Sequence, residues 1–314
     1  MEMKKKNEAL VSVIISTFNR KDYIGKAIDS VLMQTYKEVE IIIIDDYSSD
    51  GTGDYIKENY NLPNIHYYRN EKNLGCGISR KKAMTYAKGK YINFLDDDDR
   101  FIDKTYFETA VKRLEKEKNL AIVCGSHIVY DVINEVRTEK KFPYKDTVDK
   151  RELFIHFSDS EYPKPIISVA IIRRKALEKA KYEEMKILND TTIFLRVILF
   201  GDMGFIKKPQ AEYLVHGNNI SFNCKTDFII DNLDEKYKVF KIVENSNKYT
   251  KEELDKWLEK QLDITIIYFI NGSKPNYFNF RKIIKWYKNN VGNSEKIKEF
   301  KKIYKEGKRK SKEI

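Results

Sequence analysis

The first hundred residues alternate between short apolar runs and segments with apolar side chains at helical spacing. The apolar runs predict buried strands at Val11–Ser16, Val39–Ile44 and Tyr91–Leu95, and helical patterns follow the first two. Between the last two runs, Ile65–Tyr68 predicts a further strand and Ile78–Ala87 a helix. Strands alternating with helices are typical of a parallel sheet that helices cover on both faces.

The pattern changes after Leu114. We predict a strand at Leu120–Cys124 and a hairpin through His127–Tyr130 and Val136–Glu139, and another apolar run follows at Ile166–Ile172. Strands joined by a hairpin run antiparallel to each other. This part of the sheet is therefore expected to be mixed rather than a second doubly wound unit.

Helical patterns make up most of the remaining chain. Asp190 opens an amphipathic helix, Gly201 follows its end, and only helical patterns occur beyond about Asp227. We predict an α/β fold with a doubly wound, mostly parallel sheet, a mixed second half and a C-terminal helical extension. The expected boundaries are 1–226 for the α/β domain, with halves at about 9–118 and 119–226, and 227–314 for the extension.

Composition narrows the class of protein. The 314 residues are 41% hydrophobic and 34% charged, which is a globular composition. No apolar stretch approaches the roughly 20 residues of a bilayer helix, and the start MEMKKKNEAL lacks the apolar segment of a secretion signal. The cysteines are odd in number and not at metal spacing, namely Cys76, Cys124 and Cys224. We expect reduced thiols in a cytoplasmic protein.

Nearly all of the net charge of +11 lies at the C-terminal end. From Lys274 onward there are 14 Lys and Arg against 4 Glu. Aromatic residues are interleaved with them: Tyr277, Phe278, Phe280, Trp286, Tyr287, Phe300 and Tyr304. This composition favours a helical surface that touches an anionic partner, either phospholipid or nucleic acid. A solvated, Lys-rich tail explains the same composition equally well.

Three polar clusters follow predicted strands: Thr17–Asn19, Asp45–Asp46 and Asp96–Asp99. In open α/β sheets, ligands bind beyond the carboxyl ends of the strands, so these clusters are expected at one edge. Four adjacent aspartates repel one another unless a cation neutralises them. Carboxylates without nearby Cys or His favour Mg²⁺ or Mn²⁺, whose remaining ligands are commonly substrate phosphates. The alternative is a solvated acidic turn.

The familiar phosphate-binding motifs are missing. The sequence contains no G-x-x-x-x-G-K-[ST], and Gly75-Cys76-Gly77 lacks both the later glycine and the preceding strand of a dinucleotide fingerprint. These absences count against an ATPase and against a dehydrogenase, and leave another substrate that carries a diphosphate.

Four motifs in order resemble the family 2 glycosyltransferases, which are inverting nucleotide-sugar enzymes of GT-A fold. They are Ser16–Asn19, Asp45–Thr52, Asn73–Gly75 with Arg80, and Gly89–Asp99. The resemblance extends over about Val11 to Ser221. It implies that the half at 9–118 binds the nucleotide and that the half at 119–226 binds the acceptor.

The resemblance assigns nucleotide-binding roles to four residues. Thr17 and Asn19 would line the nucleotide pocket, and Asp46 would accept an N–H of the base, with Asp45 or Asp50 bracing the loop. Arg80 would contact the nucleotide or a phosphate. An arginine on an amphipathic helix is as often a surface or ion-pair residue.

The triplet Asp96–Asp98 matches the family's D-x-D motif. By that match Asp96 faces the ribose or the sugar, Asp97 belongs to the same nucleotide-sugar site, and Asp98 ligates the metal that bridges the diphosphate. Asp99 would support these residues. The implied cofactor is Mn²⁺ or Mg²⁺.

The resemblance makes Asp190 the catalytic base. Leu188-Asn189-Asp190, followed by Arg196, matches the family's acidic pair except that Asn189 replaces the common Glu. Since aspartate is also a favoured N-cap, the alternative is that Asp190 only caps a helix. His216, followed by Asn218 and Ser221, falls where some members place a histidine near the metal; a structural histidine is the alternative.

The predicted reaction is transfer of a sugar from a nucleotide diphosphate sugar to a hydroxyl of a glycan or a lipid-linked glycan in surface polysaccharide synthesis. The metal would stabilise the departing diphosphate while Asp190 takes the acceptor's proton, which inverts the anomeric centre. Alternatives are a non-catalytic nucleotide-sugar-binding protein, a nucleotidyltransferase and a nucleic-acid-binding protein. The last leaves the aspartates unexplained, so we expect no nucleic-acid partner. The tail would make the enzyme peripheral at the inner face of the cell membrane.

Overall fold

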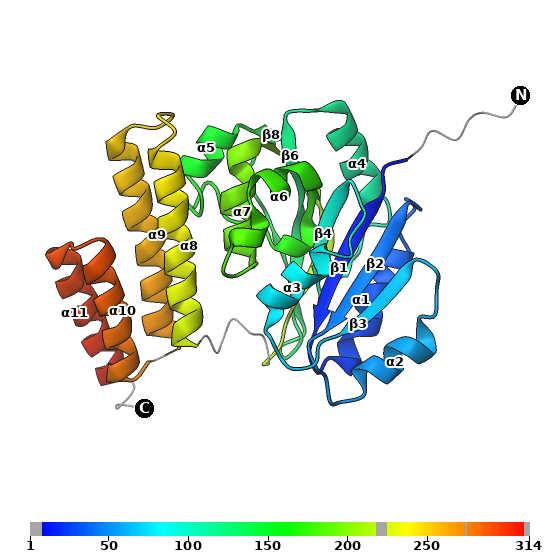
Figure 1. Ribbon diagram of the computed structural model, residues 1–314, viewed down its shortest axis with the longest axis horizontal. Helices are drawn as coiled ribbons and strands as arrows, with labels where there is room; N and C mark the ends of the chain where they lie inside the picture. The colour runs from blue at the N-terminus through cyan, green and yellow to red at the C-terminus, as the bar shows by residue number, and fades with distance from the viewer. Residues whose placement is uncertain (1–7, 218–224, 274, 311–314) are drawn as a thin grey trace, which may run out of the picture. The chain divides into compact units, whose positions relative to one another are not determined.

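The computed structural model describes the backbone of residues 8–217, 225–273 and 275–310. The chain divides into two compact units, Met1–Val215 and His216–Ile314. This division falls before the boundary at 226 that the sequence suggested. The first unit is α/β and the second is helical (Figure 1).

The first unit is built on one sheet with the strand order β3-β2-β1-β4-β9-β6-β10-β5, in which β7 also pairs with β6 and β8 with β10. The strands are β1 Val11–Thr17, β2 Val39–Asp45, β3 Ile65–Arg69, β4 Tyr91–Asp96, β5 Arg100–Phe101, β6 Leu120–Asp131, β7 Val136–Lys140, β8 Thr147–Val148, β9 Ala170–Arg173 and β10 Asp202–Val215.

Strand direction separates the two halves of the sheet. Strands β3, β2, β1 and β4 are parallel to one another. Strand β9 is antiparallel to both β4 and β6, and β10 runs parallel to β6. The fold is therefore a mixed, mostly parallel α/β sheet, as predicted.

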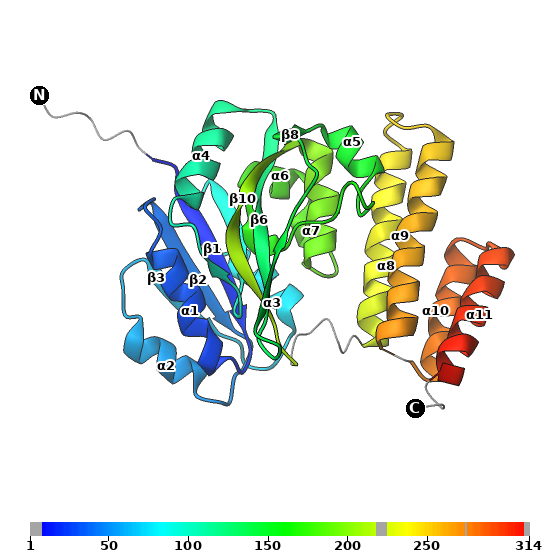
Figure 2. The same ribbon diagram turned by 180° about the vertical axis from the view of Figure 1, so that it is seen from behind.

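Helices cover both faces of the sheet (Figures 1 and 2). The helices of this unit are α1 Lys21–Leu32, α2 Thr52–Asn59, α3 Cys76–Met84, α4 Tyr106–Lys116, α5 Lys150–Ile155, α6 Arg174–Lys179 and α7 Asp190–Val197. Helices α1, α2 and α4 bury Ile24, Ile56 and Phe107 in one apolar core with Val13 of β1 and Ile41 of β2. Helix α3 packs against β1 and β2 and buries Ala83 and Met84.

The structure confirms the early strands and helices and refines two later segments. Within the apolar run Ile166–Ile172, Ile167–Val169 forms a 3₁₀ turn and the strand begins only at Ala170. The predicted hairpin is present, but its first arm continues from Leu120 as one long strand, β6. The 14-residue strand β10 was not predicted.

The second unit contains α8 Thr226–Glu244, α9 Lys251–Gly272, α10 Tyr277–Asn290 and α11 Ser294–Lys310 (Figure 1). Thr250 and Glu253 form a capping box at the start of α9. The buried ammonium group of Lys236 on α8 donates to the carbonyl of Gln261 at 2.8 Å and to the hydroxyl of Thr265 at 2.6 Å, which ties α8 to α9. Within the described ranges, the helices are too short or too polar to cross a bilayer.

Candidate active site

The strand register brings the predicted polar clusters to one edge of the sheet. Thr17 at the end of β1 lies beside Asp45 at the end of β2. On the other side of β1, Ser16 lies beside Asp96 at the end of β4. The positions of these residues follow from the sequence pattern, because each mainly apolar, buried strand ends at polar residues.

The two aspartates after β2 hold loops. Asp45 accepts hydrogen bonds from the Ser48 N–H at 2.7 Å and from the Tyr67 hydroxyl at 2.6 Å. Asp46, buried, accepts from the Asn70 side chain and the Leu74 N–H, both at 2.8 Å, and from the Gly75 N–H at 2.7 Å. Asp46, which is predicted to accept an N–H of the nucleotide base, thus fixes the loop that leads into α3.

Asn19 and Thr17 follow β1 at the same edge. Asn19 has a left-handed φ of 53°, which asparagine tolerates better than most residues. Its side-chain oxygen accepts from the Ser49 N–H at 2.8 Å, so Asn19 braces the loop after β2. The hydroxyl of Thr17 is buried beside the carboxylate of Asp97.

Asp96 and Asp97 are the first two of the four aspartates at the end of β4, and both have a raised pKa. Burial raises the pKa of Asp96 to about 7, and Asp190 and Asp98 add to the rise while Arg80 opposes it. Burial and then the charge of Asp98 raise the pKa of Asp97 to about 7. These groups therefore share a site that favours either protonation or a cation.

Asp99 serves as a connection between elements. Its carboxylate accepts from the Ser168 hydroxyl at 2.5 Å and from the Leu214 N–H at 3.3 Å. It thereby joins the end of β4 to the 3₁₀ turn before β9 and to β10. Burial raises the pKa of Asp99 well above its ordinary value, with Asp96 and Asp98 adding to the rise.

Arg80 joins Asp96 to Asp190, the predicted base. Its side chain is only 4% exposed and forms an ion pair with Asp96. It also lies 3.7 Å from a carboxylate oxygen of Asp190, and it donates to the carbonyl of Leu188 at 3.2 Å. Arg80 is therefore a buried ion-pair residue rather than a surface residue. The close packing behind it depends on Gly77, whose added Cβ would lie 2.9 Å from the Leu188 nitrogen.

Asp190 is the first residue of α7 and does not cap it. The cap is Asn189, whose side chain accepts from the Thr192 N–H at 2.9 Å in a capping box. Asn189 thus caps the helix in place of Asp190, because its side-chain oxygen already accepts a free N–H of the first turn. The Asp190 carboxylate is left to interact with cations.

Lys164 is the second cation at Asp190, and the sequence analysis missed it. Its ammonium group lies 3.3 Å from a carboxylate oxygen of Asp190. Burial by itself raises the pKa of Asp190, but Lys164 and then Arg80 outweigh burial, so the pKa lies below its usual value. The available signal was that Lys164 stands between Pro163 and Pro165, which restrict the backbone on both sides.

The remaining residues that the sequence singled out are His216, the residues that follow it, and the three cysteines. His216 is buried directly after β10 and begins the second unit. Its metal role stays a prediction. Asn218, Ser221 and Cys224 lie outside the described residues. The other two cysteines are free thiols, and burial raises the pKa of both Cys76 and Cys124.

The residues after β4 suit a hard divalent cation. The available donors are carboxylates, and Asp98 raises the pKa of each of its three aspartate neighbours, a repulsion that a bound cation would relieve. In the part of the chain that the structure describes, no three Asp, Glu, His or Cys side chains converge on one point as a complete metal cage. Mg²⁺ is usually held by one or two carboxylates with substrate phosphates.

Comparisons with known proteins identify related sequences. The sequence model described as "Glycosyl transferase family 2" matches residues 12–181. The chain is 41% identical over 109 residues to the Escherichia coli protein "UDP-Glc:alpha-D-GlcNAc-diphosphoundecaprenol beta-1,3-glucosyltransferase WfaP", which covers 35% of this chain and 43% of WfaP. In eight curated relatives, the aligned segment covers 16% to 66% of the relative's own length.

Solved structures share the fold at low sequence identity. TarS residues 1–349 of S. aureus, in complex with UDP-GlcNAc, has a TM-score of 0.66 at 17% identity, covering 90% of this chain and 81% of that one. Mannosyltransferase PcManGT from Pyrobaculum calidifontis, in complex with GDP-Man and Mn²⁺, has a TM-score of 0.55 at 15% identity, covering 91% and 76%.

Proposed function

We propose that the chain, which belongs to glycosyl transferase family 2, is a nucleotide-sugar-dependent inverting glycosyltransferase with Asp190 as its base. The sugar would pass from a nucleotide diphosphate to an acceptor hydroxyl in a single displacement. Mn²⁺ or Mg²⁺ would be held at Asp98. Thr17, Asn19, Asp46, Arg80, Asp96 and Asp97 would form the nucleotide-sugar site.

The arrangement around Arg80 is the observation that carries the proposal. One buried guanidinium contacts Asp96 on the donor side and lies 3.7 Å from Asp190 on the acceptor side. An inverting displacement needs its base on the opposite side of the sugar from the leaving group. A sugar bound near Asp96 would therefore have Asp190 within reach of the attacking hydroxyl.

The protein's own groups account for the proton transfer. Lys164 and Arg80 keep Asp190 ionised, and the N-terminus of α7 adds a further favourable field. The carboxylate would accept the proton of the acceptor hydroxyl as the new bond to the sugar forms and the bond to the diphosphate breaks. When bound, the metal supplies Lewis-acid stabilisation of the leaving diphosphate.

The acceptor we propose is a hydroxyl of a glycan or a lipid-linked glycan in surface polysaccharide synthesis. WfaP, which is similar over part of its length, is named for an acceptor sugar attached to diphosphoundecaprenol. An enzyme that acts on such an acceptor would work in the cytoplasm, peripherally at the inner face of the membrane. This localisation belongs to the proposal.

Thermal shift and product analysis test the proposal together. We expect UDP-, GDP- or dTDP-sugars to raise the unfolding temperature of the full chain, and to do so only with Mn²⁺ or Mg²⁺. Mass spectrometry of the reaction with glycan acceptors should find the intact sugar on the acceptor and a free nucleoside diphosphate. Release of pyrophosphate would indicate a nucleotidyltransferase. Binding without turnover on any acceptor would favour a nucleotide-sugar-binding protein.

A further inference from the structure

The outward side of α10 is strongly basic. Arg281, Lys282, Lys285 and Lys288 are all exposed, and the helix contains no acidic residue. None of the four forms an ion pair with a carboxylate in the described ranges. Together with the exposed Tyr277 and Phe278, they form what we call the α10 face.

The opposite side of α10 is fixed by packing within the second unit. Phe280, Ile283 and Tyr287 are buried. The Phe280 ring stacks on Tyr304 of α11, with ring centroids 4.2 Å apart. The Trp286 indole N–H donates to Asp234 of α8 at 2.6 Å. The α10 face is therefore held outward by contacts on two neighbouring helices.

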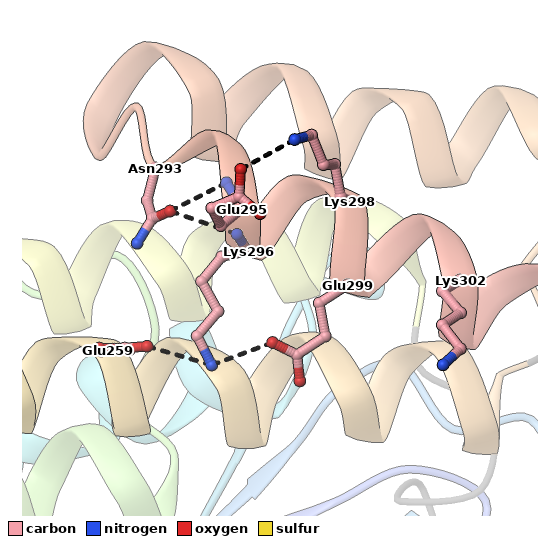
Figure 3. A pocket seen from close by; sticks show the side chains of 7 residues that line it. All are labelled: Glu259, Asn293, Glu295, Lys296, Lys298, Glu299 and Lys302. Carbon is pink, nitrogen blue, oxygen red and sulfur yellow. Dashed lines mark hydrogen bonds and ion pairs between the residues drawn. The ribbon is translucent and has the colours of Figure 1, made fainter.

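Helix α11 differs from α10, because two of its lysines, Lys296 and Lys298, are paired with carboxylates. Lys296 lies between α9 and α11 and contacts Glu259 at 3.1 Å and Glu299 at 3.2 Å (Figure 3). It also contacts Asp263 at 2.7 Å. Lys298 pairs with Glu295 at 2.8 Å. The four basic charges of α10 are thus offset by no acid on their own helix, whereas Glu295, Glu299 and Glu306 offset part of the charge of α11.

Two aromatic side chains extend the α10 face at its first turn. Tyr277 is 64% and Phe278 67% exposed. Arg281 lies over the Tyr277 ring at 5.8 Å and Lys282 over the Phe278 ring at 5.1 Å. Aromatic rings beside basic side chains are typical of helices that lie in the interface of a bilayer, where the rings enter the headgroup region.

We propose that the α10 face binds the surface of an anionic phospholipid bilayer. The basic side chains of the α10 face would attract the negatively charged lipid headgroups. The exposed rings of Tyr277 and Phe278 would add apolar area that becomes buried in the headgroup region. The binding element is one outward helix side with its aromatic residues at one end. This arrangement suits a flat lipid surface better than the groove and backbone tracking of nucleic-acid binding.

This inference deepens the proposed function and rests on it only for the location of the acceptor. Vesicle binding is measured without donor, acceptor or metal, whereas glycosyl transfer is measured on a soluble glycan. Either proposal can therefore fail while the other holds.

Co-sedimentation of the full chain with vesicles tests the α10 face. The probes are vesicles of phosphatidylglycerol mixed with phosphatidylcholine, and vesicles of phosphatidylcholine alone. One variant neutralises the α10 face by Arg281→Gln, Lys282→Gln, Lys285→Gln and Lys288→Gln. The matched control removes the same charge from α11 by Lys298→Gln, Lys301→Gln, Lys302→Gln and Lys305→Gln. A third variant carries Tyr277→Ser and Phe278→Ser.

We expect binding only to vesicles that contain phosphatidylglycerol, weakening as salt rises. Each basic side chain at such a surface contributes about fivefold, so the α10 variant should lose about 100-fold or more in partitioning. The α11 control should lose less than about fivefold, and the aromatic variant should lose affinity at constant charge. Equal losses in the α10 and α11 variants would overturn the proposal. So would salt-independent pelleting, or α10-dependent binding of single-stranded RNA without vesicle binding.

Discussion

The ammonium group of Lys164 lies 3.3 Å from a carboxylate oxygen of Asp190. The two residues are 26 positions apart in the sequence, and they meet because the segment before β9 passes the start of α7. Arg80 approaches the same carboxylate from α3. The predicted base is thus held ionised by two cations from different elements.

Lys164→Met is expected to move the acid limb of the kcat/KM pH profile to higher pH. The lysine lowers the pKa of Asp190, so its removal raises that pKa, and the base becomes protonated at a pH where the wild type is still ionised. Lys164→Arg keeps the charge and should restore the profile. A uniform loss at every pH, with the limb unmoved, would assign Lys164 to acceptor binding instead.

Asp190→Asn should reduce transfer by about 10²- to 10⁴-fold while donor binding is retained, since a general base typically contributes that much. Calorimetry with the nucleotide and initial rates on the same preparation decide this. Asn189→Ala is the matched control, because it removes the helix cap next to Asp190 and should cost about 1 kcal/mol of stability with a much smaller effect on rate. Joint loss of donor binding and activity in Asp190→Asn would move Asp190 out of the catalytic step.

Asp98→Ala should abolish metal-dependent binding of the nucleoside diphosphate and, with it, transfer. The reason is that the carboxylates after β4 fit a divalent cation, and Asp98 is the member that the D-x-D match assigns to the metal. Titration calorimetry with Mn²⁺ present and after chelation measures the effect. Unchanged activity of the wild type in EDTA would contradict the metal requirement.

His127 is expected to make the first unit less stable in mild acid. Burial, with Lys140 and Lys164 nearby, lowers its pKa to about 4, whereas an unfolded histidine titrates near 6.5. The unfolded chain therefore binds this proton first, so stability is complete above pH 6.5 and falls as the pH drops towards 4. The full loss is about 3 kcal/mol.

The His127→Phe variant isolates this effect. The ring of His127 already packs near Phe142, with centroids 5.6 Å apart, so an aromatic replacement suits the site. Urea unfolding at pH 4.5 and 7.5 should show a smaller pH difference for the variant than for the wild type. An equal difference in both would mean that other groups carry the acid sensitivity.

The elements of the first hundred residues could be predicted because each carries its own local signal. Strands β1, β2 and β4 are mainly apolar runs that end at polar residues, and each contains one buried polar residue: Ser12, Glu40 or Asn93. Strand β10 gives no such signal, since Lys207, Lys208 and Pro209 interrupt it at a register shift against β6. Its pairing along β6 is a tertiary feature that hydrophobic periodicity does not encode.

Some residues of the candidate site could likewise be predicted from the sequence, and others could not. The aspartates at the ends of β2 and β4 follow from strand ends and the known topology of parallel sheets. The identity of the α7 cap did not follow, because Asn189 and Asp190 are both favoured caps and only the Thr192 hydrogen bond distinguishes them. The contact from Lys164 depends on the path of a segment without regular structure.

The absence of a side chain at Gly77 restricts how this enzyme can be recombined with its relatives. A Cβ there would approach the Leu188 nitrogen to 2.9 Å, and one turn later Arg80 donates to the Leu188 carbonyl. Helix α3 and the segment before α7 therefore pack closely against each other, and this contact connects the two halves of the domain. A chimera that exchanges only the second half of the domain would have to keep residues 186–190 with α3, or transfer both segments together, to preserve the alignment of Arg80 with Asp190.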